Sequence, residues 1–361
     1  MNQTPVITSP DHPAMAELCG QLADLGGELE LAGHDGFPSK QLELCGQFGV
    51  FQWFMDPMFG GQGWSDADVI RGYLALSSAC LTTTFVITQR TGACRRIADS
   101  ENPFPKAQLL DDLIAGRSFA TVGISHLTTS RRHLAKPVLQ AQEADGGFVL
   151  DGFSPWVTGS PFAQHVVTGA TLDDGRQILV VLPVESSGVS IADTAQLVGL
   201  TASRTGAVRF DKVFVDEKWL LAGPAENVMQ QGIGARTGGL QTSTLALGLA
   251  DAAIGLLTKE SGKRPDLAES AEALQSQCDV RRDQLLRMAD GEDVCTQDDL
   301  RVAANSLALR ATQAALAAAK GTGYVAGHPA GRWCREALFF LVWSCPQSVM
   351  SANLCELAGL D

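Results

Sequence analysis

The chain has 361 residues, of which 45% are hydrophobic and 19% charged, and this balance is typical of a folded protein and excludes disorder. A chain of this length can bury two or three packed layers. Its formal net charge of -13 repels phosphate backbones, so we expect no nucleic-acid partner, although a local basic pocket for a phosphorylated ligand stays open.

The cysteines and the apolar runs indicate the compartment. Nine cysteines form an odd set without a Cys-x-x-Cys pair, so we expect buried, reduced thiols in a cytoplasmic protein and no metal site. Cys334, Cys345 and Cys355 are spaced near three helical turns, which predicts one shared helix face. Residues 1–13 do not resemble a signal peptide. We find no apolar run near the ~20 residues of a membrane span, so no membrane partner is expected.

Residues 1–116 have helical patterns and are predicted to form an N-terminal helical domain. Helices are expected at 39–46, from Ser65 as the cap to residue 79, and at 81–98. Pro103 and Pro105 are expected to break the chain before a helix at 106–115.

Residues 117–224 change to alternation with period two and are predicted to form a middle β-domain. Asp145-Gly146 and Asp174-Gly175 are expected hairpin turns. About seven short strands in this length suggest a small β-barrel or sandwich. The expected strands are 119–124, 138–141, 147–150, 165–170, 177–182, 189–191 and 207–215.

Residues 225–361 are helical again, with expected helices at 242–262, 267–289, 298–320 and from about Arg332 onward. Four helices joined by short loops predict an antiparallel four-helix bundle. The order of helical domain, β-domain and bundle places the chain in the α+β class.

Several motifs then resemble one family. Residues 57–63 read Pro-Met-Phe-Gly-Gly-Gln-Gly, residues 156–159 read Trp-Val-Thr-Gly after a Gly-Phe-Val-Leu-Asp-Gly strand, and residues 321–324 read Gly-Thr-Gly-Tyr ahead of Arg-Glu-Ala at 335–337. In their order and spacing these segments resemble the acyl-CoA dehydrogenase family.

The resemblance implies a flavin, FAD, between the β-domain and the bundle. Trp156 would pack near the isoalloxazine and Thr158 would hydrogen-bond around its N5 edge, since an aromatic wall and a short hydroxyl suit a flavin. Without the flanking match, Trp156 would be a barrel core residue and Thr158 a turn residue. By alignment, the remaining cofactor-binding residues are Ser125, Gly159, Gly321 and Pro346.

The resemblance is incomplete where the family binds the FAD diphosphate and holds its base. Lys263 or Arg264 would have to replace the phosphate contact. The family's Tyr-Glu-Gly-Thr segment, whose Glu removes a substrate proton, aligns with residues 343–346, so Ser344 occupies the base position. A serine hydroxyl without a partner base cannot take that proton. The family's other base position falls at 238–239, where this chain has two glycines.

Three interpretations follow. The chain is a dehydrogenase of an acyl thioester or similar compound with its base elsewhere, and His126 is then the nearest candidate. Alternatively it is a flavin monooxygenase or oxidase, with Ser125 or His126 beside the activated oxygen. The third interpretation is a non-catalytic relative that binds a ligand. Adjacent residues in a strand point apart, so Ser125 and His126 are not expected to form a nucleophile–base pair.

The resemblance also implies the partners. A small-molecule substrate is expected, with an acyl-CoA as the family's example, and Arg236 is the local cation that we assign to a CoA moiety. The family assembles through its helical bundle, so we expect a homodimer or homotetramer with an interface on helices 242–262 and 298–320.

Overall fold

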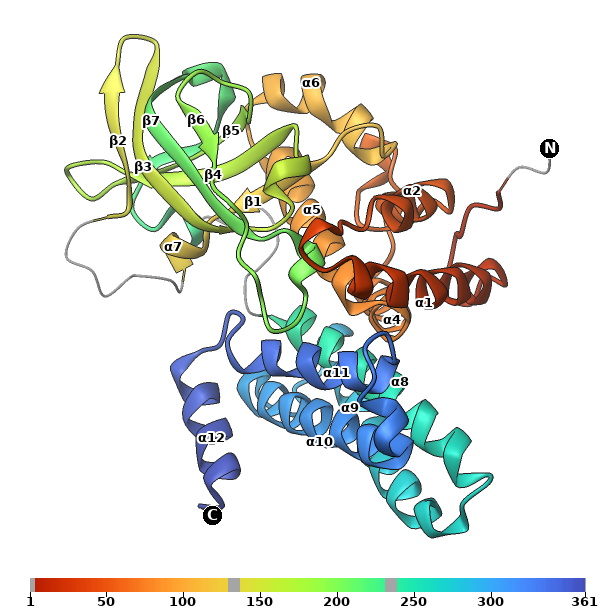
Figure 1. The fold of residues 1–361 in the computed structure, drawn as a ribbon. Helices are drawn as coiled ribbons and strands as arrows, with labels where there is room; N and C mark the ends of the chain where they lie inside the picture. Colours follow the sequence, from red (N-terminus) through yellow and green to blue (C-terminus); the bar gives the residue numbers. More distant parts are fainter. Residues whose placement is uncertain (1–3, 129–136, 231–238, 361) are drawn as a thin grey trace.

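The structure is a computed structural model that describes residues 4–128, 137–230 and 239–360 (Figure 1). N-terminal helices lie beside a β-sheet domain, and both lie against the C-terminal helices (Figure 1). The α+β class predicted from the sequence is confirmed. Arg236, the cation assigned to CoA, lies outside the described residues.

The N-terminal helices follow the predicted pattern, with three differences. Neither the first helix, α1, nor the short helix α3 was located from the sequence. The prolines at 103 and 105 do not break the chain, because Asn102 caps α6 and a proline is tolerated in the first turn of a helix. Ser65 caps α4 as predicted, accepting from the Asp68 N–H at 3.1 Å. The helices are α1 Ala14–Ala32, α2 Ser39–Gln47, α3 Val50–Trp53, α4 Asp66–Ala79, α5 Leu81–Asp99 and α6 Pro103–Ile114.

The β-domain is one mixed sheet in the order β6-β7-β3-β2-β4-β5-β8, with β1 paired in parallel to β4. The strands are β1 Ala120–Gly123, β2 Leu139–Ala144, β3 Gly147–Val157, β4 His165–Thr171, β5 Gln177–Pro183, β6 Val189–Ile191, β7 Gly206–Asp216 and β8 Leu220–Ala225, and a short helix α7 spans Ser125–Thr128. β8 was not predicted. Inward side chains of β2 to β5 and β7 form an apolar core of their own.

The C-terminal helices are α8 Leu240–Ser261, α9 Ala268–Ala289, α10 Gln297–Gly323, α11 Pro329–Ala337 and α12 Gln347–Ala358. The prediction of one continuous final helix was wrong. A 3-10 turn at Leu338–Leu341 follows α11, and the chain is irregular until α12 begins. Pro346 contributes to the interruption because it cannot donate a helical hydrogen bond.

The predicted common helix face of the three C-terminal cysteines was wrong for the same reason. Cys334 lies in α11, Cys345 lies in the interruption and Cys355 lies in α12. The three cysteines therefore do not lie on one helix, and their regular spacing does not place them on a common face.

Helix α8 is the most apolar of the C-terminal helices. By length and composition alone it could cross a membrane, which corrects the expectation that no apolar run approaches that length. However, 67% of its most apolar window is buried inside the structure, where α8 packs against α4 and α10. Its apolar character is accounted for by its place in the core.

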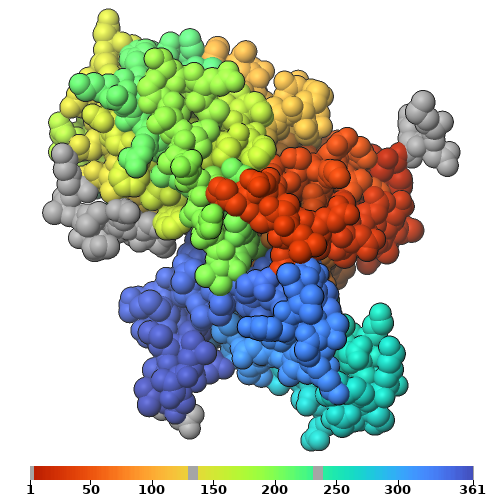
Figure 2. Space-filling view, viewed as in Figure 1, coloured from red at the N-terminus to blue at the C-terminus, as the bar shows by residue number. Residues whose placement is uncertain are grey.

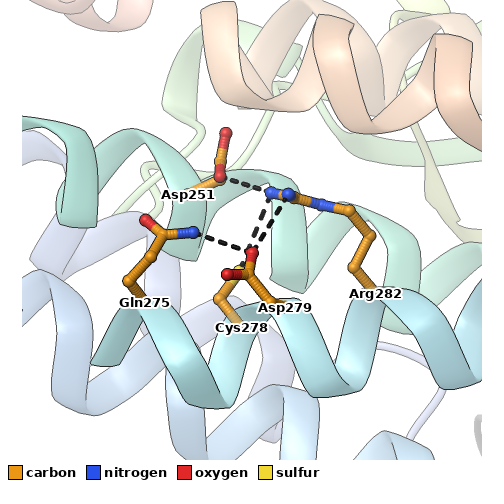
Figure 3. Close-up of polar contacts among 5 residues, drawn as sticks. All are labelled: Asp251, Gln275, Cys278, Asp279 and Arg282. Atoms are coloured by element: carbon orange, nitrogen blue, oxygen red, sulfur yellow. Dashed lines mark hydrogen bonds and ion pairs between the residues drawn. The ribbon is translucent and has the colours of Figure 1, made fainter. Parts of the chain in front are cut away.

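A polar cluster joins α8 to α9 (Figure 3). The guanidinium of Arg282 on α9 pairs with the carboxylate of Asp251 on α8 and, at 3.4 Å, with Asp279. Gln275 donates to the same Asp279 carboxylate at 2.9 Å. One arginine thus joins two helices in this part of the fold.

The β-domain and the N-terminal helices both contact the C-terminal helices. The segment between β6 and β7 reaches down to them in Figure 2, and there Gly199 lies against the Arg335 backbone, where a Cβ would be 2.8 Å from the carbonyl oxygen. From α4, the Ser77 hydroxyl donates to the Leu245 carbonyl of α8 at 2.8 Å. The Gly199 contact joins the β-domain to α11, the helix that precedes Ser344, and the Ser77 contact joins the N-terminal helices to α8.

Candidate functional site

Trp156 lies near the end of β3 and is 51% exposed. It is therefore not a barrel core residue, which was one of the two interpretations of the sequence. β3 and β7 change register between Ser154 and Val157, so the inward–outward alternation slips just before this residue. The result is an indole ring on the surface of the β-domain that is open to a flat ligand.

Thr158 is buried beside Trp156, and its hydroxyl is already engaged. The hydroxyls of Thr158 and Thr205 lie 3.0 Å apart, and that of Ser203 lies 2.9 Å from Thr205. A hydroxyl has one donor and two acceptor sites, so Thr158, with one partner, keeps capacity for further hydrogen bonds. Gly159 has φ 67°, and a Cβ there would be 2.8 Å from the ring of Phe119, so only glycine fits this turn.

Ser125 and His126 lie in α7, directly after β1. The expectation that they occupy a strand was wrong, because α7 is a short helix. Neighbouring residues of a helix do not face each other either, so the expectation that the two form no nucleophile–base pair stays a prediction. The Ser125 hydroxyl is buried, and no described residue hydrogen-bonds with it. An unpaired buried hydroxyl is costly, which makes Ser125 a candidate ligand contact.

His126 is held as a neutral imidazole with one free nitrogen. Its Nε2 lies 2.8 Å from the Gly169 carbonyl oxygen, which can only accept, so Nε2 carries the hydrogen. Nδ1 then has the lone pair, and it is buried without a partner among the described residues. Burial lowers the pKa of His126 below its ordinary value. At neutral pH the ring is therefore uncharged and basic at Nδ1.

These residues share one edge of the β-domain. The Thr121 hydroxyl of β1 donates to the Thr158 carbonyl at 2.7 Å, which joins β1 to the end of β3. A Cβ on Gly123 would be 2.5 Å from the Ser154 hydroxyl, so glycine allows these strands to approach. Within the described residues Ser154 and Ser160 also have buried, unpaired hydroxyls, which the sequence analysis missed. A glycine in a strand was the available signal for this close approach.

Ser344 lies in the interruption between α11 and α12. Its φ is 44°, the left-handed region that residues other than glycine seldom adopt. Ser344 is the residue that the alignment assigns to the position of the family's catalytic carboxylate. The neighbouring Cys345 is not an activated nucleophile, because burial raises the pKa of its thiol despite the nearby Arg301. Pro346 is the N-cap residue of α12 and offers no side-chain hydrogen bond.

Gly321 lies in the last turn of α10, next to a break in the helix at Lys320, where φ is 54°. A Cβ on Gly321 would meet nothing within 4 Å, so its surface is open. Arg264 is not a free phosphate contact, because it donates to the Ala318 carbonyl at 2.8 Å and pairs with Asp266 at 3.6 Å. Lys263 is exposed and stays a candidate.

The structure therefore brings the β-domain candidates together at one edge and leaves the bundle candidates at the interruption and at the end of α10. In the part of the chain that the structure describes, no hydrogen bond or ion pair links the two groups. α7 lies at the edge of the β-domain that faces the C-terminal helices (Figure 1). A separate hollow of about 290 Å³ lies between α9, α10 and α12, away from these residues.

The chain is similar in sequence to several curated proteins and in fold to several solved structures. The mitochondrial isovaleryl-CoA dehydrogenase of Oryza sativa subsp. japonica is 28% identical over 272 residues, which cover 66% of this chain and 63% of that protein. The chain is a relative of the acyl-CoA dehydrogenases. The oxygenase component of the FADH(2)-dependent resorcinol hydroxylase of a Rhizobium species is 27% identical over 196 residues, which cover 52% of this chain and 43% of that protein. These matches span less than two thirds of either relative.

The acyl-CoA dehydrogenase fold is shown over the whole chain. Butyryl-CoA dehydrogenase from Megasphaera elsdenii superposes with a TM-score of 0.80 at 16% identity, covering 99% of this chain and 100% of that chain. TdsC from Paenibacillus, solved with FMN and indole, superposes with a TM-score of 0.79 at 17% identity, covering 96% and 95%. No family model matches the sequence.

Proposed function

We propose that this chain is an FAD-dependent oxidoreductase that removes hydrogen from an acyl thioester or a similar small molecule, with His126 as the proton acceptor. The unpaired, neutral Nδ1 of His126 at the flavin edge of the β-domain carries this proposal. General-base catalysis requires an unprotonated, positioned acceptor, and the lone pair on Nδ1 of the neutral imidazole meets that requirement. No carboxylate is available at position 344 to take that role.

The residues at this edge fit a flavin. Trp156 offers an open aromatic face, Thr158 and Ser125 offer hydroxyls, and Gly159 allows close approach of the backbone. A bound flavin would supply hydride acceptance at N5. FAD is proposed rather than FMN because one of the sequence relatives, the resorcinol hydroxylase component, is named as FADH(2)-dependent, whereas FMN is named only with solved structures that are 19% and 17% identical. A titration with both cofactors distinguishes them.

A second candidate function is a flavin-dependent monooxygenase. Ser344 in place of a carboxylate favours it, because oxygen chemistry on a flavin does not need a base at that position. The similarity to the resorcinol hydroxylase oxygenase component supports the same idea. In this case Ser125 and His126 would hold the reacting oxygen by hydrogen bonds.

We further propose a cytoplasmic homodimer or homotetramer, with the C-terminal helices at the interface. Exposed apolar side chains support this proposal, namely Met350, Leu354 and Leu357 on α12 and Tyr324 and Val325 in the turn after α10. The small-molecule substrate, with acyl-CoA as the first choice, remains part of this proposal.

Anaerobic titration of the flavin-loaded protein tests these functions against each other. The dehydrogenase predicts bleaching of the flavin absorbance by at least one acyl-CoA in a series of chain lengths. The monooxygenase predicts no bleaching but fast oxygen consumption by the reduced, loosely held flavin. A protein that binds flavin and does neither would be a non-catalytic relative, and one that binds none would contradict both proposals.

A further inference from the structure

The interruption between α11 and α12 exposes backbone carbonyls that a continuous helix would pair. The last carbonyls of any helix lack an intrahelical donor, and a buried carbonyl without a partner is costly. Here the carbonyls of Phe340 and Trp343 lie just before Ser344, in a segment that is packed against the bundle. Some group outside α11 must therefore satisfy them.

Two residues of α10 do so. A terminal nitrogen of Arg301 donates to the Trp343 carbonyl at 2.8 Å, and the amide nitrogen of Asn305 donates to the Phe340 carbonyl at 3.1 Å. Arg301 Nε also donates to the Asn305 side-chain oxygen at 3.0 Å. Being one helical turn apart on α10, the two side chains form a single connected clamp.

Arg301 is buried although no carboxylate of the described residues lies at ion-pair distance from it. It is 4% exposed and Asn305 is 0% exposed. Burial lowers the pKa of Arg301 to about 10, so it keeps its charge at neutral pH. A buried cation held by carbonyls and an amide, rather than by an anion, is costly for stability alone. This cost is a reason to look for a role in the segment that it holds.

That segment includes Ser344 and Trp343. The Trp343 ring stacks on Phe339 at 5.0 Å and meets Phe85 of α5 edge-on at 5.1 Å. Ser344 then takes its left-handed conformation between two held points, the Trp343 carbonyl and the start of α12. Unusual backbone conformations persist only where the surroundings impose them.

We propose that Arg301 and Asn305 are positioning residues, which set the conformation of the turn from 340 to 346 and so place Ser344 at the flavin site. The proposal rests on the proposed function for its catalytic meaning, since neither residue is assigned a contact with flavin or substrate. If the clamp were purely structural, its loss would change the local order of the turn and flavin binding only as far as it lowers the stability of the whole fold.

The test uses Arg301→Gln and Arg301→Lys in the full chain, with Arg310→Gln as the control on the same helix. Arg310 is exposed, and among the described residues it donates a hydrogen bond to the Ser306 hydroxyl at 3.1 Å. Two readouts are taken under conditions where every variant is folded by circular dichroism. They are the rate of chymotrypsin cleavage at residues 339–343 in the protein without flavin, and the Kd for FAD.

We expect Arg301→Gln to raise both the cleavage rate and the Kd about tenfold, as for loss of one charged hydrogen bond. Arg301→Lys should raise the cleavage rate and the Kd by less than Arg301→Gln does. Arg310→Gln should leave both values within twofold of the parent. If Arg301→Gln does not fold, Asn305→Asp decides, because its carboxylate keeps a charged acceptor beside Arg301 but cannot donate to the Phe340 carbonyl. Unchanged cleavage of the turn in these variants would overturn the proposal. Because cleavage is measured without flavin, it remains decisive even if the protein binds none and the proposed function fails.

Discussion

At the scale of single residues, the protonation state of His126 is the most informative feature. Its Nε2 donates to the Gly169 carbonyl and its Nδ1 has no partner among the described residues. The ring is therefore either a base or a buried polar group that lowers the stability of the fold. The free histidine pKa is about 6.5, and burial moves that of His126 lower. The two roles can be separated by pH.

The first prediction concerns stability. Between the lowered folded pKa and about 6.5, the unfolded chain binds a proton that the folded chain excludes, so acidification destabilises the fold. His126→Gln should reduce this loss, since glutamine can still donate to Gly169. His165, whose pKa is also lowered by burial, contributes in the same direction and is replaced in a second variant. Urea unfolding from pH 8 to pH 5 measures both, and identical pH slopes in parent and variants would refute this account of His126.

The second prediction concerns activity. If His126 is the base, His126→Gln should lower kcat by roughly 10²–10⁴ while FAD binding stays nearly unchanged. The parent should keep its activity somewhat below pH 6.5, because the lowered pKa keeps Nδ1 free of a proton there. His165→Gln serves as the control. A His126→Gln enzyme with full kcat would remove this residue from the mechanism.

The third prediction uses the missing carboxylate. Ser344→Glu should create or accelerate flavin bleaching by acyl-CoA at least tenfold, since a desolvated carboxylate suits α-proton removal. Ser344→Gln has nearly the same size and left-handed backbone strain, so it controls for both. Equal bleaching rates in the two variants would show that position 344 does not face the reacting carbon.

At the scale of elements, the contact of α4 with α8 depends on one small residue. A Cβ on Gly248 would lie 2.7 Å from the Ser77 Cβ and 2.8 Å from the Leu74 carbonyl oxygen, whereas one on Gly255 of the same helix would meet nothing within 4 Å. We expect Gly248→Ala to lower the free energy of unfolding by about 1–3 kcal/mol, because the helices must separate.

Gly255→Ala is the matched control and should raise that free energy by about 0.5–1 kcal/mol through helix propensity. Urea unfolding of both variants provides the comparison. Shifts of the same sign and size would mean that the α4–α8 crossing is looser than described.

The contact of α5 with α11 depends on a buried carboxyl. Glu336 accepts from the Thr82 hydroxyl at 3.1 Å and lies 3.9 Å from Arg332, and burial raises the pKa of this carboxyl. A raised folded pKa means that stability is lost as pH increases through it. Arg332→Met should therefore cost about 3 kcal/mol at pH 8 and less at pH 5, where the carboxyl is more readily protonated. A loss independent of pH, measured by thermal unfolding, would contradict this reasoning.

The elements also show what the sequence could predict. Local sequence signals were sufficient to predict an element where a helix cap or a hydrophobic period determined it without long-range contacts, as for the cap Ser65 and for β4 to β7. The interruption before α12 was missed because the apolar run at 338–342 continues the helical pattern, while the stabilising donors come from α10. The outward position of Trp156 was likewise hidden, since the register change in β3 is made by pairing with β7.

At the scale of the whole molecule, we propose that the β-domain presents a flavin-binding surface toward the C-terminal helices, where Ser344 stands at the position that the alignment assigns to the carboxylate. The fold itself is shown over nearly the full chain, whereas the roles of Trp156, Ser125, His126 and Ser344 are proposals. These roles share one premise, which is that a flavin is seated at the edge formed by β1 and β3.

Titration of the purified, flavin-free chain with FAD, and in parallel with FMN, tests that premise most directly. The account predicts saturable binding of one flavin per chain, and a Kd raised about tenfold by Trp156→Ala through loss of ring stacking. Phe214→Ala, which removes a similarly exposed ring from β7, should leave the Kd unchanged. The absence of saturable binding by either flavin, or equal Kd values for parent and Trp156→Ala, would contradict the account.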